Sequence, residues 1–315
     1  MKHIRLIAVV LVVTLLAALV PAGMAQDSTF GLSGEDFALW SDANAQSGAS
    51  DNLAYSFSLD LNVDADPDSI AVSMTGSGVI SQDGLFSLNV AGDIPAGQDG
   101  ALQPFTFELR VVDNMLYVNL GDGWQGGTVD EVMSGVGQMA GSMTGVDLES
   151  LAEGDMSDMM AMPGMMEGLS ALSELDINDY ITIDRLDNAD GQAHFSTEIL
   201  LADLLSSDAL SGLLGAAVAG QMGGSSTEMT DQQIQQMGAM VGMMFADLSL
   251  TFDQYISTET NLVERGVLTF DLPLPGMMTG GTNVNINLVF DIGLEYPESV
   301  EVTAPESFEP FQMGS

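Results

Sequence analysis

The sequence of 315 residues contains no cysteine, so its fold cannot be held by disulfide bonds. The stability of a folded domain then has to come from a packed core. A chain of about 300 residues is long enough for this, because it buries roughly 75% of the surface of its unfolded state. The absence of a thiol also excludes covalent lipid attachment at an N-terminal cysteine.

Basic residues are almost as rare as cysteine. Beyond residue 25 the chain contains three arginines (Arg110, Arg185 and Arg265) and no lysine against 45 acidic residues, which gives a formal net charge of −42. Such a charge repels phosphate backbones and anionic head groups, so nucleic acids and acidic membranes are not expected partners. We interpret the charge as an adaptation for solubility. The hydrophobic content of 46% favours a folded chain over a disordered one.

Long hydrophobic runs are also absent, except at the N-terminus. Residues 1–25 have the pattern of a secretory signal peptide, with Lys2 and Arg5 before an apolar run at 6–20 and small residues at 23–25. Cleavage would leave Gln26 as the first residue, whereas retention of the segment as an anchor is the alternative. No later run approaches the roughly 20 residues of a membrane span. We therefore expect an exported, soluble protein in the periplasm, in the cell envelope or outside the cell.

A short helix is predicted within a polar lead-in at 26–50. A long strand is predicted directly after the lead-in. In SGEDFALWSDANAQ at 33–46, Ser33 has the position of an N-cap with Asp36 three residues later, and Phe37 and Trp40 share one helix face. The apolar period then changes from about 3.6 to 2. In LAYSFSLDLNV, from Leu53 on, apolar and polar residues alternate, which predicts a half-buried strand.

The same alternation recurs and predicts a large antiparallel sheet with one apolar face. The predicted strands lie at 53–120, at 180–186 and 191–197, and at 248–304, where the last is SVEVTAP. Between 128 and 247 the chain is richer in Gly, Met and Leu, and we expect mainly helices there. The predicted fold class is α+β: residues 51–315 form a single half-barrel domain, a large curved antiparallel sheet whose apolar face is covered by the central helices.

No motif in the sequence indicates an enzyme, a cofactor or a metal centre. His194 and Ser196 are on a predicted strand without a nucleophile-elbow motif. DADPD, starting at Asp64, resembles the start of a calcium loop, but Ser69 takes the place of the required glycine and Thr75 that of the bidentate glutamate. A solvated hairpin turn is the preferred interpretation.

Methionine is concentrated in the predicted helical segments. Of the 22 methionines, 15 lie at 133–166 or 222–244, six of them in DMSDMMAMPGMMEG at 155–168. Methionine is adaptable and is common on surfaces that fit variable apolar partners, so these segments are interpreted as a soft cover over the sheet. Two alternatives stay open: the methionines fill an imperfect core, or the cluster at 155–168 binds Cu(I) through its thioethers.

The order of these segments resembles that of exported lipid-carrier proteins of the LppX/LprG and LolA type. The resemblance is carried by DFALWSDANAQ followed by YSFSLDLNV, by FTFELRVVDNMLYVNLGDGW, by the central helices and by the closing LEYPESVEVTAPESF. It implies a half-barrel with helices at its mouth and a cavity for lipid or acyl chains, and it brings no catalytic residues. The chain departs from the LppX/LprG type in lacking the lipobox cysteine, and its few basic residues do not suit an anionic head group.

Taken together, these observations predict a non-enzymatic binder or carrier of a hydrophobic ligand, such as a lipid or an acyl chain, between the sheet and the methionine-rich helices. The alternative is a structural envelope or surface protein with a fully packed core. The predicted lining consists of Phe57, Leu59, Met74, Phe86, Phe107, Leu250, Phe270 and Ile286 from strands and Met159, Met160, Met237 and Met244 from helices.

Overall fold

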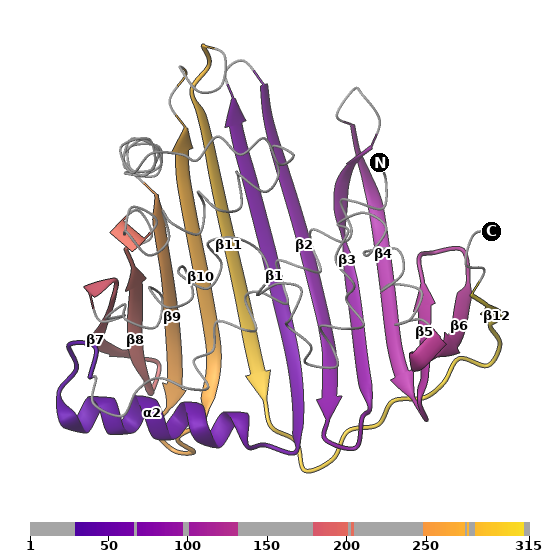
Figure 1. The fold of residues 1–315 in the computed structure, drawn as a ribbon, viewed down its shortest axis with the longest axis horizontal. Helices are drawn as coiled ribbons and strands as arrows, with labels where there is room; N and C mark the ends of the chain where they lie inside the picture. Colours follow the sequence, from indigo (N-terminus) through magenta and orange to yellow (C-terminus); the bar gives the residue numbers. More distant parts are fainter. Residues whose placement is uncertain are drawn as a thin grey trace, which may run out of the picture.

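The computed structural model describes residues 29–65, 68–96, 101–131, 179–200, 203–204, 248–274, 276 and 281–311. In these residues, twelve strands form a single sheet, and one long helix, α2 (Gly34–Gly48), crosses the end of it (Figure 1). The signal segment, the methionine cluster at 155–168 and most of the predicted central helices lie outside the described residues. None of the described helices is long and apolar enough to cross a membrane.

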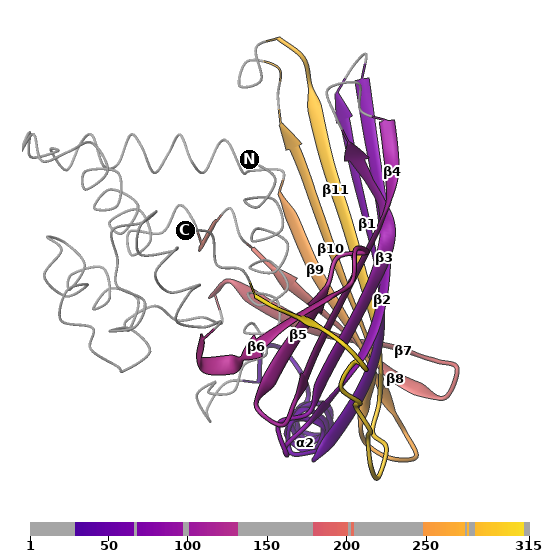
Figure 2. The same ribbon diagram turned by 90° about the vertical axis from the view of Figure 1, so that its right-hand side faces the viewer.

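The large antiparallel sheet predicted from the alternation is confirmed, and it is twisted and curved, with α2 on one side (Figure 2). Its order is β12-β6-β5-β4-β3-β2-β1-β11-β10-β9-β8-β7, and all pairs are antiparallel except β12 on β6. The strands are β1 (Asn52–Ala65), β2 (Asp68–Ser81), β3 (Phe86–Ala96), β4 (Ala101–Val112), β5 (Met115–Asn119), β6 (Trp124–Thr128), β7 (Ile181–Ala189), β8 (Gln192–Ile199), β9 (Ser249–Ser257), β10 (Val263–Leu274), β11 (Val284–Glu295) and β12 (Glu309–Pro310).

Tight turns connect the strands where the sequence supplies residues that accept a positive φ. Asp113 and Asn114, between β4 and β5, have φ values of 51° and 60°. Asp190 and Gly191, between β7 and β8, have φ values of 50° and 82°. Positive φ at both central residues is the geometry of the two-residue hairpin turn whose twist matches that of the flanking strands. These turns fix the register of the strands that they connect.

The predicted helix cap at Ser33 is confirmed. The Ser33 hydroxyl oxygen accepts a hydrogen bond from the backbone N–H of Asp36 at 3.2 Å and donates one to the Asp36 carboxylate at 2.6 Å. This satisfies one of the free N–H groups of the first turn and places two acidic residues, Glu35 and Asp36, at the positive end of the helix dipole.

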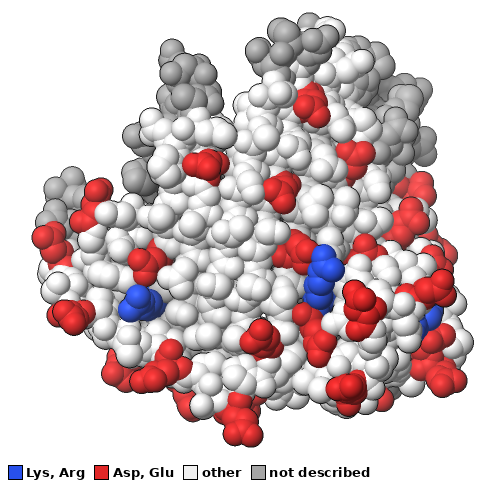
Figure 3. All heavy atoms as spheres, turned by 180° about the vertical axis from the view of Figure 1, so that it is seen from behind, with Lys and Arg blue, Asp and Glu red and all other residues white. Residues whose placement is uncertain are grey.

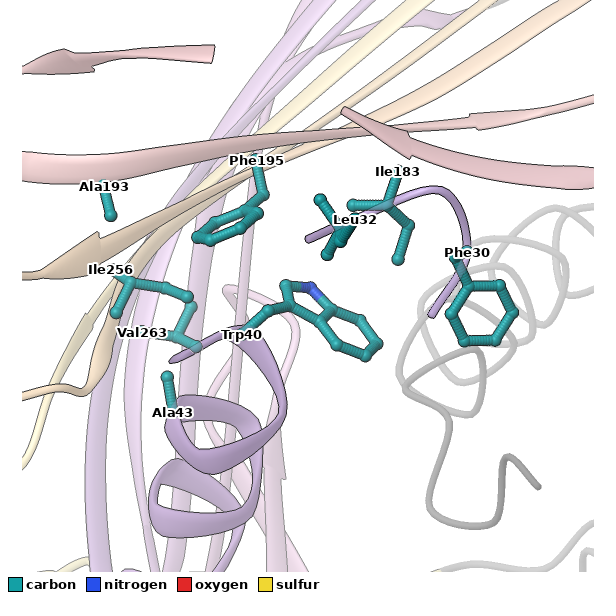
Figure 4. Close-up of a cluster of buried hydrophobic side chains, with 9 residues drawn as sticks. All are labelled: Phe30, Leu32, Trp40, Ala43, Ile183, Ala193, Phe195, Ile256 and Val263. Atoms are coloured by element: carbon teal, nitrogen blue, oxygen red, sulfur yellow. The ribbon is translucent and has the colours of Figure 1, made fainter. Parts of the chain in front are cut away.

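The helix belongs to the core, although its segment reads as a polar lead-in. Trp40 is 7% exposed and Ala43 is fully buried. Both pack with side chains of β7 to β10 in one cluster (Figure 4). The members of the cluster are Phe30, Leu32, Trp40, Ala43, Ile183, Ala193, Phe195, Ile256 and Val263.

The prediction of a strand at SVEVTAP is wrong, because residues 299–305 do not form a strand. The alternating valines, Val300 and Val302, have no free neighbour there, since β11 is already paired with β1 on one side and with β10 on the other. A strand needs a partner, so local alternation is not sufficient. The chain instead crosses to the other end of the sheet, where Glu309 and Pro310 pair with β6.

Candidate ligand-binding face

The strand register places the alternating apolar side chains on one face of the sheet, which we call the apolar face. Residues directly opposite each other on neighbouring strands point to the same side. Leu59 lies opposite Met74 of β2, and the successive opposite residues continue the face to β3 and β4. On its other side Leu59 lies opposite Phe290 of β11, and the successive opposite residues continue the face to β10 and β9. The apolar face contains Leu53, Tyr55, Phe57, Leu59, Leu61, Val63, Ile70, Val72, Met74, Ile80, Phe86, Leu88, Val90, Ile94, Phe105, Phe107, Leu109, Val111, Leu116, Val118, Ile181, Ile183, Phe195, Ile199, Leu250, Phe252, Leu268, Phe270, Leu272, Leu274, Val284, Ile286, Leu288, Phe290, Ile292 and Leu294.

All eight strand residues that the sequence predicts as lining lie on the apolar face. They are Phe57, Leu59, Met74, Phe86, Phe107, Leu250, Phe270 and Ile286. Leu59, Met74 and Phe107 are buried, and the other five are half-buried. The predicted methionines Met159, Met160, Met237 and Met244 lie outside the described residues. That these side chains line a ligand cavity stays a prediction.

Arg185 of β7 pairs with Phe195 and is one of three charged residues that the described register places on this face, with Asp68 of β2 and Glu309 of β12. Its guanidinium lies 5.1 Å from the Phe195 ring centre and 3.6 Å from the Asp36 carboxylate. Arg185 therefore belongs to the end of the sheet where α2 is attached. Between β9 and β5 the described register places Asp68, at the tip of the β1–β2 hairpin, on this face and no basic residue that could hold an anionic head group.

Glycines interrupt the apolar face on β2 and β3, where large neighbours lie flat across them. A Cβ atom added at Gly76 would be 2.3 Å from Cζ of Phe57, and one at Gly78 would be 2.4 Å from the hydroxyl of Tyr55. The Tyr55 hydroxyl donates a hydrogen bond to the carbonyl oxygen of Ser87 at 3.0 Å. Burial raises the pKa of Tyr55 to about 12. Without the glycines these two rings would have to stand away from the sheet.

A polar contact fixes α2 to one end of the apolar face. The indole N–H of Trp40 donates to the side-chain oxygen of Gln254 at 2.6 Å, and the Gln254 amide donates to Asn44 at 3.0 Å. Gln254 is 6% exposed, and its polar atoms are satisfied by the helix. The helix thus covers the face at the β8–β10 end.

The opposite face of the sheet, the polar face, carries scattered acidic side chains (Figure 3). His194 Nε2 lies 3.1 Å from a carboxylate oxygen of Asp253, and its ring stacks on Tyr255 at 4.4 Å. Arg265 forms two hydrogen bonds with Asp291, at 2.9 and 2.6 Å. These are side-chain pairs across neighbouring strands, as expected on a solvated sheet surface. In the described part of the chain no three His, Asp or Glu side chains are grouped to hold a metal ion.

A hollow of about 380 Å³ lies over β2, β3 and β4, but it is open to solvent. Six of its nine lining residues belong to the polar face: Thr75, Ser77, Asn89, Ala91, Thr106 and Glu108. It is therefore not the enclosed apolar cavity that the sequence predicts.

Sequence reasoning missed the polar anchors and the glycines of this face. Gln254 occupies a position on β9 where the alternation places apolar residues. A polar residue at such a position indicates a buried polar contact. Gly76 and Gly78 occupy positions on β2 where the alternation places apolar residues. Glycine within a strand indicates a bend or the close approach of another group to the backbone. Both signals were present in the sequence. Their partners, Trp40 and Tyr55, are distant in sequence and could not be identified from it.

No family model matches this chain, and no curated protein matches it. Among solved structures, the chain is similar to the crystal structure of LprF from Mycobacterium bovis, with a TM-score of 0.34 and 14% identity over 87% of this chain and 98% of that one. It is also similar to a DUF1329 family protein from Desulfovibrio piger, with a TM-score of 0.23 and 12% identity over 84% of this chain and 92% of that one. Neither likeness is close enough to support a statement on the function of this chain.

Proposed function

We propose that this protein is an exported, non-enzymatic carrier that binds the hydrocarbon part of a lipid or another acyl compound against the apolar face. The observation that supports the proposal is the continuity of this face from β5 to β9, where the register places a single charged residue, Asp68 at the first position of β2. An apolar sheet face needs an apolar partner, either a ligand or other segments of the chain, because large exposed apolar patches are rare on monomeric proteins.

The physical driving force for such a ligand is the removal of its methylene groups from water. Each buried methylene contributes about 0.8 kcal/mol, so ten of them contribute roughly 8 kcal/mol before the costs of ordering the ligand. No ionic contact is needed at this magnitude. The three arginines beyond residue 25 already have carboxylate partners: Arg110 with Glu108, Arg185 with Asp36 and Arg265 with Asp291, in the order of the chain.

The first test is mass spectrometry under native conditions on the protein purified from its own cells, followed by organic extraction. Co-purifying lipid and saturable uptake of a fluorescent fatty acid by the delipidated protein are the expected results. A clean mass of the chain alone together with no uptake would refute the proposal and favour the structural protein with a filled core. Stoichiometric Cu(I) binding in place of lipid would favour the thioether site at 155–168.

A matched pair of variants tests whether the apolar face is the binding surface. Val90 and Ala91 are neighbours on β3, and the register places Val90 on the apolar face between Gly76 and Phe107, whereas Ala91 is exposed on the polar face. Val90→Thr keeps the shape of the side chain but adds a hydroxyl group, and we expect about tenfold weaker fatty-acid binding. Ala91→Ser adds the same group on the other side of the sheet and is expected to leave the affinity unchanged. Equal effects of the two variants would show that the ligand is bound elsewhere.

A further inference from the structure

The pairing between β2 and β3 stops before either strand ends. The two strands pair from Ile80 opposite Phe86 to Ser73 opposite Asp93. Residues 68–72 of β2 and 94–96 of β3 continue as strands, but the register between β2 and β3 does not include them. Each of these stretches remains paired within its own hairpin, β1–β2 or β3–β4. The tips of the two hairpins therefore diverge, as Figure 1 shows.

The sequence of the diverging stretch is that of a strand edge. Pro95 lies in it and has no N–H to give to a neighbouring strand, and proline within sheets is confined to edges and bulges. Asp93, the last paired residue of β3, is exposed on the polar face, and charged side chains on edges oppose the addition of another strand. The gap is thus encoded by residues that disfavour its closure by hydrogen bonding.

Below the gap, glycines of β2 and β3 occupy positions where a side chain would collide with the backbone of the neighbouring strand. A Cβ atom at Gly78 would be 2.0 Å from the carbonyl oxygen of Ser87, and one at Gly92 would be 2.5 Å from that of Ser73. Glycine at such positions permits a sharp bend between neighbouring strands. The two hairpins are therefore held firmly together up to Ser73 and are separate beyond it.

Apolar side chains flank the gap on the apolar face. Ile70 and Val72 lie on the β2 side, and Ile94 lies on the β3 side. Ile70 is 46% exposed, and Ile80, at the other end of β2, is 42% exposed. On the polar face the gap is bordered by the small, exposed Ser69 and Ala71. The unpaired stretch is thus bordered by small and aliphatic residues on both faces, with Asp68 at the tip of the β1–β2 hairpin.

We propose that the gap between the tips of the β1–β2 and β3–β4 hairpins is the route by which a hydrocarbon chain reaches the apolar face. This inference rests on the proposed function, because it requires a ligand on that face. A flexible, slender acyl chain fits a slot between two strands, whereas a rigid fused-ring compound would have to separate the hairpins below Ser73, where the glycines hold them together. The predicted ligand class is therefore a compound with an extended hydrocarbon chain.

The absence of cysteine from the chain allows the route to be blocked at a single chosen position. Ile70→Cys places a thiol in the gap, and a bulky maleimide attached there would obstruct it. Leu102→Cys is the matched control, because Leu102 is an aliphatic residue of similar exposure, 52%, near the tip of the β3–β4 hairpin, on β4 and on the polar face. The measurement is the rate of uptake and release of a fluorescent fatty acid by stopped-flow fluorescence, before and after labelling.

The expected result is that the label at position 70 slows both uptake and release tenfold or more. The label at position 102 leaves both rates unchanged. A label at position 70 that weakens the affinity without slowing exchange would make Ile70 part of the binding wall and would overturn the proposed route. Unchanged rates at both positions would overturn it as well.

A second variant keeps the inference testable if the label disturbs the fold. In Val72→Cys with Ile94→Cys, a short cleavable bifunctional thiol reagent would join the two edges of the gap. We expect exchange to stop on cross-linking and to return on cleavage, and exchange that continues in the cross-linked protein refutes the route. Failure of the proposed function is distinct from these outcomes, since the unlabelled protein would then take up no fatty acid at all.

Discussion

The hydrogen bond between Trp40 and Gln254 permits a sharp test of how α2 is attached to the sheet. The two side chains are 7% and 6% exposed, and the bond from the indole nitrogen to the amide oxygen is 2.6 Å long. The variants are Trp40→Phe, Gln254→Leu and the double variant. Each single change leaves a buried polar group without its partner, whereas the double change removes both groups.

The expected magnitudes follow from the cost of a buried, unsatisfied polar atom. Trp40→Phe also loses part of the ring volume, so we expect a loss of about 2–4 kcal/mol in the free energy of unfolding. Gln254→Leu leaves the Trp40 N–H unsatisfied and removes the bond to Asn44, with an expected loss of about 1–3 kcal/mol. The double variant is expected to lose no more than Trp40→Phe alone, which gives a coupling energy of about 1–3 kcal/mol between the two positions.

Urea unfolding followed by far-UV circular dichroism measures these differences, because fluorescence would also report on Trp124, the second tryptophan. The dependence of the free energy on urea must be the same in all four proteins for the comparison to hold. Losses that add within about 0.5 kcal/mol would refute the reasoning, since residues that do not interact behave in this way. The helix would then be held by packing alone.

Three further changes test the sheet, the cap and a buried hydroxyl group. Gly78→Val forces a side chain against the Ser87 carbonyl and should lower the free energy of unfolding by about 3 kcal/mol or more, whereas Gly48→Ala, with nothing within 4 Å, should change it by less than about 1 kcal/mol; urea unfolding measures both, and similar losses would contradict the close approach. Ser33→Ala should cost about 1 kcal/mol through the lost cap, and an unchanged urea midpoint would show that the cap contributes nothing. Because burial raises the pKa of Tyr55 from 10.0 to about 12, the unfolded chain loses this proton first, so stability is complete below pH 10 and falls as the pH rises to 12. Tyr55→Phe should reduce this fall between pH 9 and 12, and an equal fall in both proteins would contradict it.

Those parts of the fold that depend on local sequence could be predicted. The alternation around Leu59 located β1 and its apolar side, and the Ser33 cap located the start of α2. Asp113 and Asn114 are residue types that accept a positive φ, so the hairpin turn between β4 and β5 also has a local cause. In each case the physical cause acts within a few residues, through side-chain direction, backbone hydrogen bonding or allowed φ angles.

The parts that depend on distant partners could not be predicted. The pairing of β1 with β11 joins residues more than 200 positions apart, such as Leu59 and Phe290. The burial of Trp40 depends on β9, and the failure of Val302 to form a strand depends on the lack of a free neighbour. The apolar face follows from periodicity alone, whereas its depth and its route of access depend on the glycines of β2 and β3 and on where their pairing stops.

The difference between the paired outer edges of the sheet and the unpaired inner edge supports a functional origin of the gap between β2 and β3. Both outer edges are capped by terminal segments: the carbonyl oxygen of Phe30 accepts from the N–H of Ile183 on β7, and Glu309 and Pro310 pair with β6. Unpaired strand edges promote aggregation, and capping them is a common protection. A chain that pairs other segments with its outer edges but leaves the inner edge at Pro95 unpaired retains a liability that pairing would remove. Passage of a ligand is a reason to retain it, and the slowing of fatty-acid exchange by a label at Ile70 would measure that passage directly.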